Sequence, residues 1–197
     1  MNPSRISSDE KEMLSTYIGV GILILLALVA AYYVFVLAKK EVAQVRGFDP
    51  NRPVPTDTVL RKRLSAEAWG IVREHRMETP FQNKFWNDTN PGIYVDVITG
   101  EPLFSSADKF DAGVGLPTFS KPISNDLVVE SLDTRFHMQR IEVLAKRSNG
   151  FLGHRFPEPK SPTGQRYTVN SAAFRFIPLE RMKEEGYEAY LPLLEKK

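Results

Sequence analysis

Residues that could carry covalent or metal chemistry are few in this sequence. Cysteine is absent from all 197 residues, which excludes thiolate nucleophiles, disulfide bonds and every cysteine-based zinc site. The histidines, His75, His137 and His154, are far apart in the chain and lack the spacing typical of paired metal ligands. We therefore expect no metal and no other cofactor, and we expect these histidines in surface or loop positions.

The charged and glycine-rich segments give little support to phosphate or nucleic-acid chemistry. Gly113-Val114-Gly115 lacks the third glycine of a dinucleotide-binding loop, so it favours a tight turn. The formal net charge is only +2, which argues against nucleic acid as a partner. The basic cluster Arg61-Lys62-Arg63 favours a solvated helix face. Contact with anionic lipid headgroups is the alternative, because an apolar segment precedes the cluster.

That apolar segment is long enough to cross a membrane. The 21 residues from Tyr17 to Leu37 carry no charge and would form a helix of about 31 Å, which matches the hydrocarbon core of a bilayer. We expect a single-pass anchor at residues 17–38, after a tail at 1–16, with Leu25 in the lipid and Tyr17, Tyr32 and Tyr33 near the interfaces. A cleaved signal peptide is the alternative, although its apolar core is usually shorter.

The basic residues that flank this segment predict its orientation. Two lie before it and four lie after it, and an excess of Lys and Arg marks the cytoplasmic side. They are Arg5 and Lys11 before the segment, and Lys39, Lys40, Arg46 and Arg52 after it. We therefore expect the protein in the inner (cytoplasmic) membrane, with the rest of the chain in the cytoplasm.

The remainder of the chain is predicted to be an extended arm followed by one folded domain. Gly47 and prolines at positions 50, 53 and 55 indicate the arm at residues 39–57, and the domain follows at 58–197. Apolar residues at helical spacing predict a helix over 58–75. Alternating or continuous apolar runs at 92–97, 139–144 and 172–177 predict strands. We therefore expect a mainly β (α+β) fold, built of antiparallel strands with additional helices.

The order of these segments resembles the B-type methionine sulfoxide reductases, which reduce the R epimer of methionine sulfoxide. The resemblance covers about residues 79–178 and extends weakly through a helix at 180–193. It rests on these segments: Thr79-Pro80-Phe81-Gln82-Asn83, Gly92-Ile93-Tyr94, Gly100-Glu101-Pro102-Leu103-Phe104-Ser105-Ser106, Lys109-Phe110-Asp111, Pro117-Thr118-Phe119, Leu152-Gly153-His154, Pro162-Thr163-Gly164, Arg166-Tyr167 and Asn170-Ser171-Ala172-Ala173. It implies two antiparallel sheets around a shallow substrate pocket, with peripheral helices.

The resemblance also implies that the catalytic site is degenerate. Thr168 stands at the position of the nucleophilic cysteine, and Val114 stands at that of the resolving cysteine. Leu116 replaces the tryptophan that receives the substrate methyl group, and Phe151 replaces the first of two histidines. A threonine hydroxyl cannot supply the thiolate and sulfenic acid that this chemistry requires. The four zinc cysteines of some members correspond to Asp96, Thr99, Ala145 and Ser148.

Four polar residues of the implied pocket remain in the sequence. They are His154, Glu158, Arg166 and Asn170, with Glu158 where the family often has aspartate. We expect them to persist as hydrogen-bonding supports, because buried polar groups must be paired. The alternative is a pocket that still binds a methionine-like side chain or another small ligand.

These expectations favour a non-catalytic, membrane-anchored protein that serves as an accessory or scaffolding subunit of a larger membrane complex, with other membrane subunits and the lipid bilayer as partners. A respiratory or photosynthetic assembly would be a natural host. One alternative is a binding module for methionine or its sulfoxide on a partner. A working reductase is a remote alternative, because nothing in the chain substitutes for the thiolate.

Overall fold

The chain forms two compact units, residues 1–46 and 47–197. The structure is a computed structural model, and it describes residues 8–43, 47–135 and 139–195. The second unit begins earlier than the domain expected from the sequence, because Phe48 packs against a cluster of buried residues in it. His137 lies outside the described residues.

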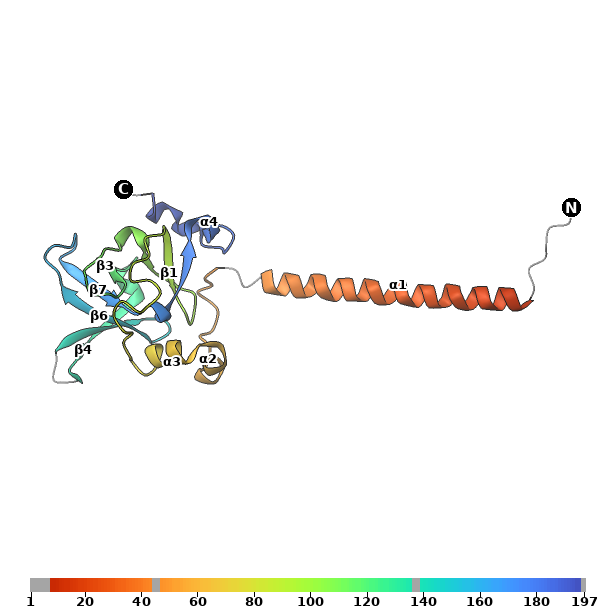
Figure 1. Cartoon of the computed structure of the whole chain (residues 1–197), viewed down its shortest axis with the longest axis horizontal. Helices are drawn as coiled ribbons and strands as arrows, with labels where there is room; N and C mark the ends of the chain where they lie inside the picture. The colour runs from red at the N-terminus through yellow and green to blue at the C-terminus, as the bar shows by residue number, and fades with distance from the viewer. Residues whose placement is uncertain (1–7, 44–46, 136–138, 196–197) are drawn as a thin grey trace. The chain divides into compact units, whose positions relative to one another are not determined.

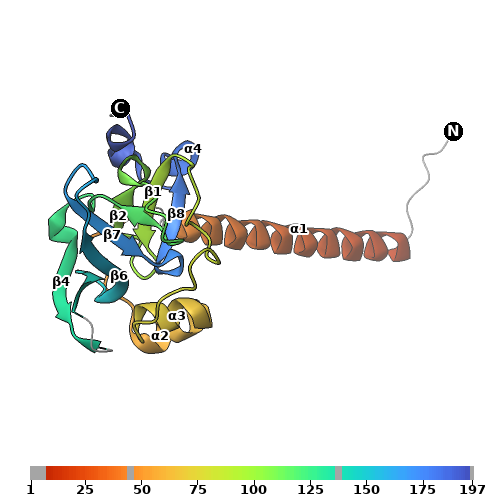
Figure 2. The same ribbon diagram turned by 60° about the vertical axis from the view of Figure 1, so that its left-hand side comes forward.

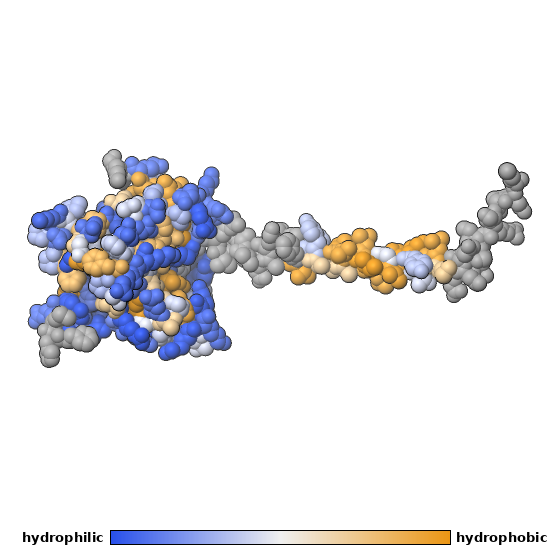
Figure 3. Space-filling model, viewed as in Figure 1, coloured by the Kyte–Doolittle hydropathy of each residue, from blue (hydrophilic) through white to orange (hydrophobic). Residues whose placement is uncertain are grey.

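The first unit contains one uninterrupted helix, α1 (Ser8–Ala43). Within it, Met13–Val34 is long and apolar enough to cross a membrane, and none of that stretch is buried (Figure 3). Each of the side chains of Tyr17, Leu25, Tyr32 and Tyr33 is more than half exposed, whereas the side chain of Leu37 lies outside the described part. An exposed apolar helix of this kind suits a membrane anchor or a signal sequence.

The prediction of one continuous helix over residues 58–75 is wrong. The structure has two short helices instead, α2 (Asp57–Arg63) and α3 (Ala66–Val72). Leu64 between them is extended, and the Ser65 hydroxyl accepts a hydrogen bond of 3.1 Å from the backbone N–H of Ala68. Ser65 therefore caps a new helix, which ends the first one.

Two antiparallel sheets make up the domain, as predicted (Figures 1 and 2). The first has the order β2-β1-β8, with β1 at Gly92–Asp96, β2 at Pro102–Ser105 and β8 at Phe174–Pro178. The second has the order β3-β7-β6-β5-β4, with these bounds: β3 Thr118–Phe119, β4 Val128–Asp133, β5 Arg140–Ala145, β6 Gly150–Pro157 and β7 Gln165–Val169. Short 3-10 turns η1 (Ser106–Asp108) and η2 (Asn125–Leu127) lie at connections between strands.

Aromatic side chains from both sheets form the main core. Tyr94 of β1 and Phe119 of β3 have ring centroids 5.0 Å apart, and Phe104 of β2 stacks on Phe119 at 4.7 Å. All three side chains are fully buried. Because one sheet supplies Tyr94 and Phe104 and the other supplies Phe119, this cluster holds the sheets face to face.

The C-terminal region differs from the sequence prediction in two places. Residues Ser171–Ala173 form a 3-10 turn, η4, so β8 begins only at Phe174. The helix expected over 180–193 is wrong as one element: α4 (Leu179–Met182) and the 3-10 segment η5 (Glu188–Leu193) replace it. Gly186 between them has a φ of 79°, a left-handed conformation that ends a helix.

Candidate functional site

Five side chains from five neighbouring strands form one row across the larger sheet. Strand register places Ser131 opposite Glu142, Glu142 opposite His154, His154 opposite Thr168, and Thr168 opposite Thr118. Partners in register share a face, and the strand neighbours of Thr168 belong to the core on the other side. The sequence-predicted residues His154 and Thr168 are therefore brought side by side.

Thr168 is buried without a hydrogen-bonding partner. Its residue is 5% exposed, and its hydroxyl oxygen has no partner within the structure. An unpaired buried hydroxyl is unfavourable, because its hydrogen bonds to water have been lost without replacement. Thr168 is thus a packed residue of β7, and no group in the described part of the chain accepts a hydrogen bond from its hydroxyl.

The imidazole of His154 is hydrogen-bonded to a carboxylate. His154 is 3% exposed, and its Nε2 lies 3.0 Å from Oδ2 of Asp133. Arg135 and Arg140 also donate to Asp133, at 2.7 and 2.8 Å. Hydrogen bonding from Arg135 is the main reason why the pKa of Asp133 is well below its usual value. Burial lowers the pKa of His154, so its neutral form is favoured. The surface or loop position expected for this histidine is wrong.

A second carboxylate connects this network to the other described histidine. Glu142 accepts from Arg135 at 2.8 Å, and its Oε2 lies 2.9 Å from Nδ1 of His75. The imidazole of His75 also stacks on Phe151, with centroids 4.8 Å apart, and Phe151 meets the ring of His154 edge-on at 5.4 Å. Phe151 therefore fills the space between two imidazoles, each of which has its own carboxylate partner.

Arg166 and Glu158 lie further along the strands from Thr168. The guanidinium carbon of Arg166 stands 4.9 Å from the centroid of Phe156, which is its partner in register on β6. The Nε atoms of Arg166 and of Arg140 are buried and have no partner. Glu158 lies in the turn after β6, where its backbone N–H donates to Gly164. The structure gives Arg166 no carboxylate partner in its described part.

The side chain of Asn170 bonds to two backbone segments. It is fully buried, its Oδ1 accepts from the backbone N–H of Glu78 at 2.8 Å, and its Nδ2 donates to the carbonyl of Leu152 at 2.9 Å. The Glu78 carboxylate in turn accepts from the backbone N–H groups of Ser171 and Ala172. These bonds join the segment after α3 to the turn between β7 and β8, and they use the side-chain amide of Asn170 in doing so.

Val114 and Leu116 lie in a loop beside β7. The carbonyl of Pro117 accepts from the backbone N–H of Val169, so this loop runs next to the strand that carries Thr168. Both side chains are half-buried. Phe81 packs against Gly115 and has a φ of 63°, an unusual value for a bulky residue. Its backbone N–H donates to the carbonyl of Gly115 at 2.7 Å, which holds that conformation.

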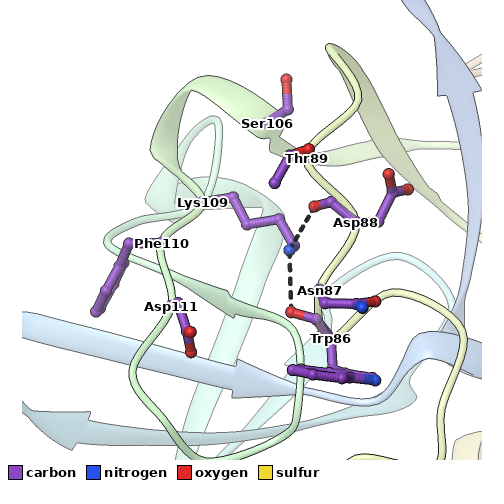
Figure 4. Close-up of a pocket in the computed structure, with 8 residues that line it drawn as sticks. All are labelled: Trp86, Asn87, Asp88, Thr89, Ser106, Lys109, Phe110 and Asp111. Atoms are coloured by element: carbon purple, nitrogen blue, oxygen red, sulfur yellow. Dashed lines mark hydrogen bonds between the residues drawn. The ribbon is translucent and has the colours of Figure 1, made fainter.

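A separate pocket of about 320 Å³ surrounds Lys109 (Figure 4). Its ammonium group donates to the backbone carbonyls of Asp88, at 2.7 Å, and Trp86, at 3.3 Å. Burial lowers the pKa of Lys109. The remaining lining residues are Asn87, Thr89, Ser106, Phe110 and Asp111, and none belongs to the row that contains Thr168. Lys109 connects two loops, and two of its three N–H donors are used in doing so.

Residues 64–178 match the SelR domain. The chain belongs to the SelR family. This match covers more than half of the chain and confirms the resemblance to B-type methionine sulfoxide reductases. Because the chain contains no cysteine, its SelR domain lacks the thiolate on which reductase chemistry depends. The equivalence of Thr168, Val114, Leu116 and Phe151 with particular catalytic positions stays a prediction.

The residues that the resemblance aligns with zinc ligands include Asp96, which lies in a hydrogen-bonded turn; that alignment stays a prediction. Asp96 is 1% exposed and accepts from the Thr99 hydroxyl at 2.7 Å and from the backbone N–H of Ile98 at 3.1 Å. The Ser148 hydroxyl also bonds to it. Burial raises the pKa of Asp96. Among the described residues, no group of three or more His, Asp or Glu side chains is placed to hold a metal ion.

Sequence reasoning missed most of the groups that surround the SelR site. Asp133, Arg135, Arg140 and Glu142 follow no motif, and their partners are decided by strand register. Glu142 and His75 are 67 positions apart in the chain. A partial signal existed for Arg140, which lies at the start of the predicted strand 139–144, whereas Asp133 lies in β4, for which the sequence analysis predicted no strand.

Proposed function

We propose that this protein is a non-catalytic, membrane-anchored SelR-domain protein that serves as an accessory or scaffolding subunit of a larger membrane protein complex. The observation that carries the proposal is Thr168, a buried threonine with an unpartnered hydroxyl next to a histidine already bonded to Asp133. A hydroxyl with a pKa far above 7 cannot form the sulfenic acid of the reductase reaction, and the chain offers no thiol elsewhere.

The retained scaffold supports a role for the surfaces of the domain. Two sheets, a closed aromatic core and the Asn170–Glu78 bonds persist although the chemistry is gone. The apolar helix α1 supports the anchor, and Gly19, Gly21, Ala27, Ala30 and Ala31 in it allow close approach of neighbouring helices. A respiratory or photosynthetic assembly is a natural host for such a subunit.

The basic residues that flank α1 support a domain on the cytoplasmic side of the cytoplasmic membrane. Four of them follow the apolar segment and two precede it. Acidic residues contribute little to this rule, so the excess on the domain side decides the direction.

Native complexes test the proposal most directly. The tagged full-length protein, solubilised in mild detergent, should migrate with a large complex on a native gel at fixed stoichiometry. A Leu25→Arg variant places a charge at the middle of the apolar segment and should be lost from the membrane and from the complex, whereas Leu25→Phe should behave as the unchanged protein. Migration only as a free monomer would contradict the proposal.

The mass of the mature protein separates an anchor from a signal sequence. A retained anchor predicts that the membrane-extracted chain still contains Tyr17 to Tyr33. Removal of this segment before the protein reaches its final location would contradict the anchor, whatever complex the domain joins.

A second candidate is a binding module for methionine or methionine sulfoxide. Three unpartnered polar atoms in one sheet favour it, namely the Thr168 hydroxyl and the Arg166 Nε on β7, and the Arg140 Nε on β5, with β6 between the two strands. Calorimetric titration of the full-length protein with methionine-sulfoxide peptides tests this. The scaffold proposal expects no heat of binding, and a signal that Arg166→Ala abolishes would favour the binding module.

A further inference from the structure

The helix α2 presents a basic face with apolar residues beside it. Arg61, Lys62 and Arg63 are all exposed. Val59 on the same helix is 44% exposed, and Val54 shortly before it is 37% exposed. Isolated exposed apolar residues are ordinary. Two of them next to three basic residues form a surface that can attract anionic headgroups by charge and also place apolar side chains in the lipid interface.

Packing of one residue fixes which side of α2 faces outward. Leu60 is fully buried, so the helical period turns Val59 and Lys62, three positions apart, away from the core. Arg61 lies over the ring of Trp69, with its guanidinium carbon 4.1 Å from the ring centroid. That contact holds Arg61 against the domain while leaving its charge exposed.

The acidic groups near this face are partly neutralised. Asp57, at the start of α2, pairs with Arg73 at 2.9 Å. Glu74 pairs with Arg76 and accepts from the indole N–H of Trp69. Glu67 on α3 is exposed and is the remaining carboxylate beside the basic cluster. Because two carboxylates have cationic partners of their own, the exposed face keeps an excess of positive charge.

The length of chain before α2 keeps this face close to a bilayer. From Val34, where the described stretch that could cross a membrane ends, to Gly47, the first residue of the domain, is 13 positions along the sequence. Even a fully extended chain of that length reaches only about 45 Å, and any helical part shortens it. A tethered surface of this kind meets the membrane at a high effective concentration, so weak attraction is enough for contact.

We propose that the basic face of α2 docks onto anionic lipid headgroups of the bilayer that holds α1, with Val54 and Val59 entering the interface. The inference rests on the anchor in the proposed function. It adds that the domain rests on the membrane through α2.

Single-site labelling tests this docking cleanly, because the chain has no cysteine of its own. Full-length protein with Val59→Cys is labelled with a fluorophore and reconstituted into nanodiscs that contain a nitroxide-labelled quencher lipid. The discs consist of phosphatidylcholine alone or with phosphatidylglycerol. Leu179→Cys is the control position: Leu179 is 38% exposed and begins α4, which lies across the domain from α2 in both views (Figures 1 and 2).

Docking predicts strong quenching at position 59 in anionic discs, weak quenching there in neutral discs, and weak quenching at position 179 in both. Lys62→Gln with Arg63→Gln should lower the ratio of docked to undocked protein about fivefold for each residue, so about 25-fold together. Lys160→Gln with Lys183→Gln removes the same charge elsewhere and should leave the ratio unchanged. High salt should reduce quenching at position 59.

Two results would overturn the docking. One is equal quenching at positions 59 and 179, and the other is quenching at position 59 that neither anionic lipid nor the Lys62 and Arg63 substitutions alter. Co-elution of the protein with the discs reports on α1 separately. Protein that co-elutes but shows no quenching at position 59 retains its anchor and lacks the docking, whereas protein that fails to co-elute contradicts both.

Discussion

The buried hydroxyl of Thr168 lowers the stability of the domain. Its hydroxyl is shielded from water and has no partner, while the residue across the strand pair, His154, is bonded to Asp133. Removing an unsatisfied buried hydroxyl and removing a satisfied one have different effects on the free energy of unfolding. The two possibilities therefore have opposite consequences for stability.

Thr168→Val should leave the free energy of unfolding unchanged or raise it by about 1 kcal/mol, because the substitution removes an unsatisfied buried group at nearly constant volume. Chemical denaturation of the two proteins measures the difference. Thr118→Val is a matched control on the paired strand: the Thr118 hydroxyl donates to the carbonyl of Leu116 at 3.0 Å, so its loss should be destabilising. A stability loss at Thr168 of similar size would indicate a satisfied hydroxyl.

The protein should not reduce methionine sulfoxide, and Thr168→Cys should restore at most a trace of activity. A thiol at this position would be buried, which raises the pKa of a cysteine and disfavours the thiolate. It would also lack a second thiol to resolve the sulfenic acid. A single-turnover assay with excess dithiothreitol and a methionine-R-sulfoxide peptide measures both proteins. Strong recovery in Thr168→Cys would mean that the substrate pocket is intact.

Burial of His154 and the hydrogen bonds from Arg135 to Asp133 should make the domain sensitive to acid. The pKa of His154 is lowered on folding, so the unfolded chain binds the proton more readily and stability falls as the pH drops below about 6.5. The lowered pKa of Asp133 adds a further loss below about pH 4, where the unfolded carboxylate becomes protonated.

Thermal midpoints between pH 5 and pH 8 measure the first of these losses. His154→Gln keeps an N–H donor for Asp133 but cannot titrate, so its midpoint should vary less with pH over this range. Equal slopes for the two proteins would show that another group carries the pH dependence.

At the scale of elements, the turn around Asp96 holds together two hairpins of different sheets. Asp96 ends β1, whereas Ser148 lies in the turn between β5 and β6. Their hydrogen bond, with those from Ile98 and Thr99, holds the turn closed.

Asp96→Ala should lower the free energy of unfolding by about 2–3 kcal/mol, because it leaves the backbone N–H groups of Ile98 and Thr99 without an acceptor. Asp96→Asn retains one acceptor oxygen and should cost less. Denaturation curves with and without EDTA complete the test, since a turn held by hydrogen bonds should be indifferent to the chelator. Loss of stability on adding EDTA would reveal a metal in the native protein.

Local patterns predicted the elements better than their boundaries and contacts. The strands at 92–97 and 139–144 were recognisable because alternation or a continuous apolar run survives in a short window. Periodicity could not reveal the break at Ser65, because Leu60, Leu64 and Ala68 keep helical spacing across it. The network of Asp133 and Glu142 was beyond prediction for another reason: its partners meet only when the register of β4, β5 and β6 and the position of His75 are known.

For the whole molecule, orientation in the membrane is the property with the clearest test. Trypsin added to intact cells or spheroplasts should leave the domain whole if it lies in the cytoplasm. The same protease added to inverted vesicles should cleave it, and permeabilised cells provide the control for access. Cleavage in intact cells combined with protection in inverted vesicles would reverse the assignment.

The hydrogen-bonded turn at Asp96 also bears on how the protein matures. A zinc site is complete only after metal delivery, and a disulfide only after oxidation, so each ties folding to a cellular compartment. Here Asp96, Thr99 and Ser148 close the turn with groups that the chain already carries, and there is no thiol to be oxidised or metallated. These bonds therefore form without an oxidant or a delivered metal ion, whichever compartment holds the domain.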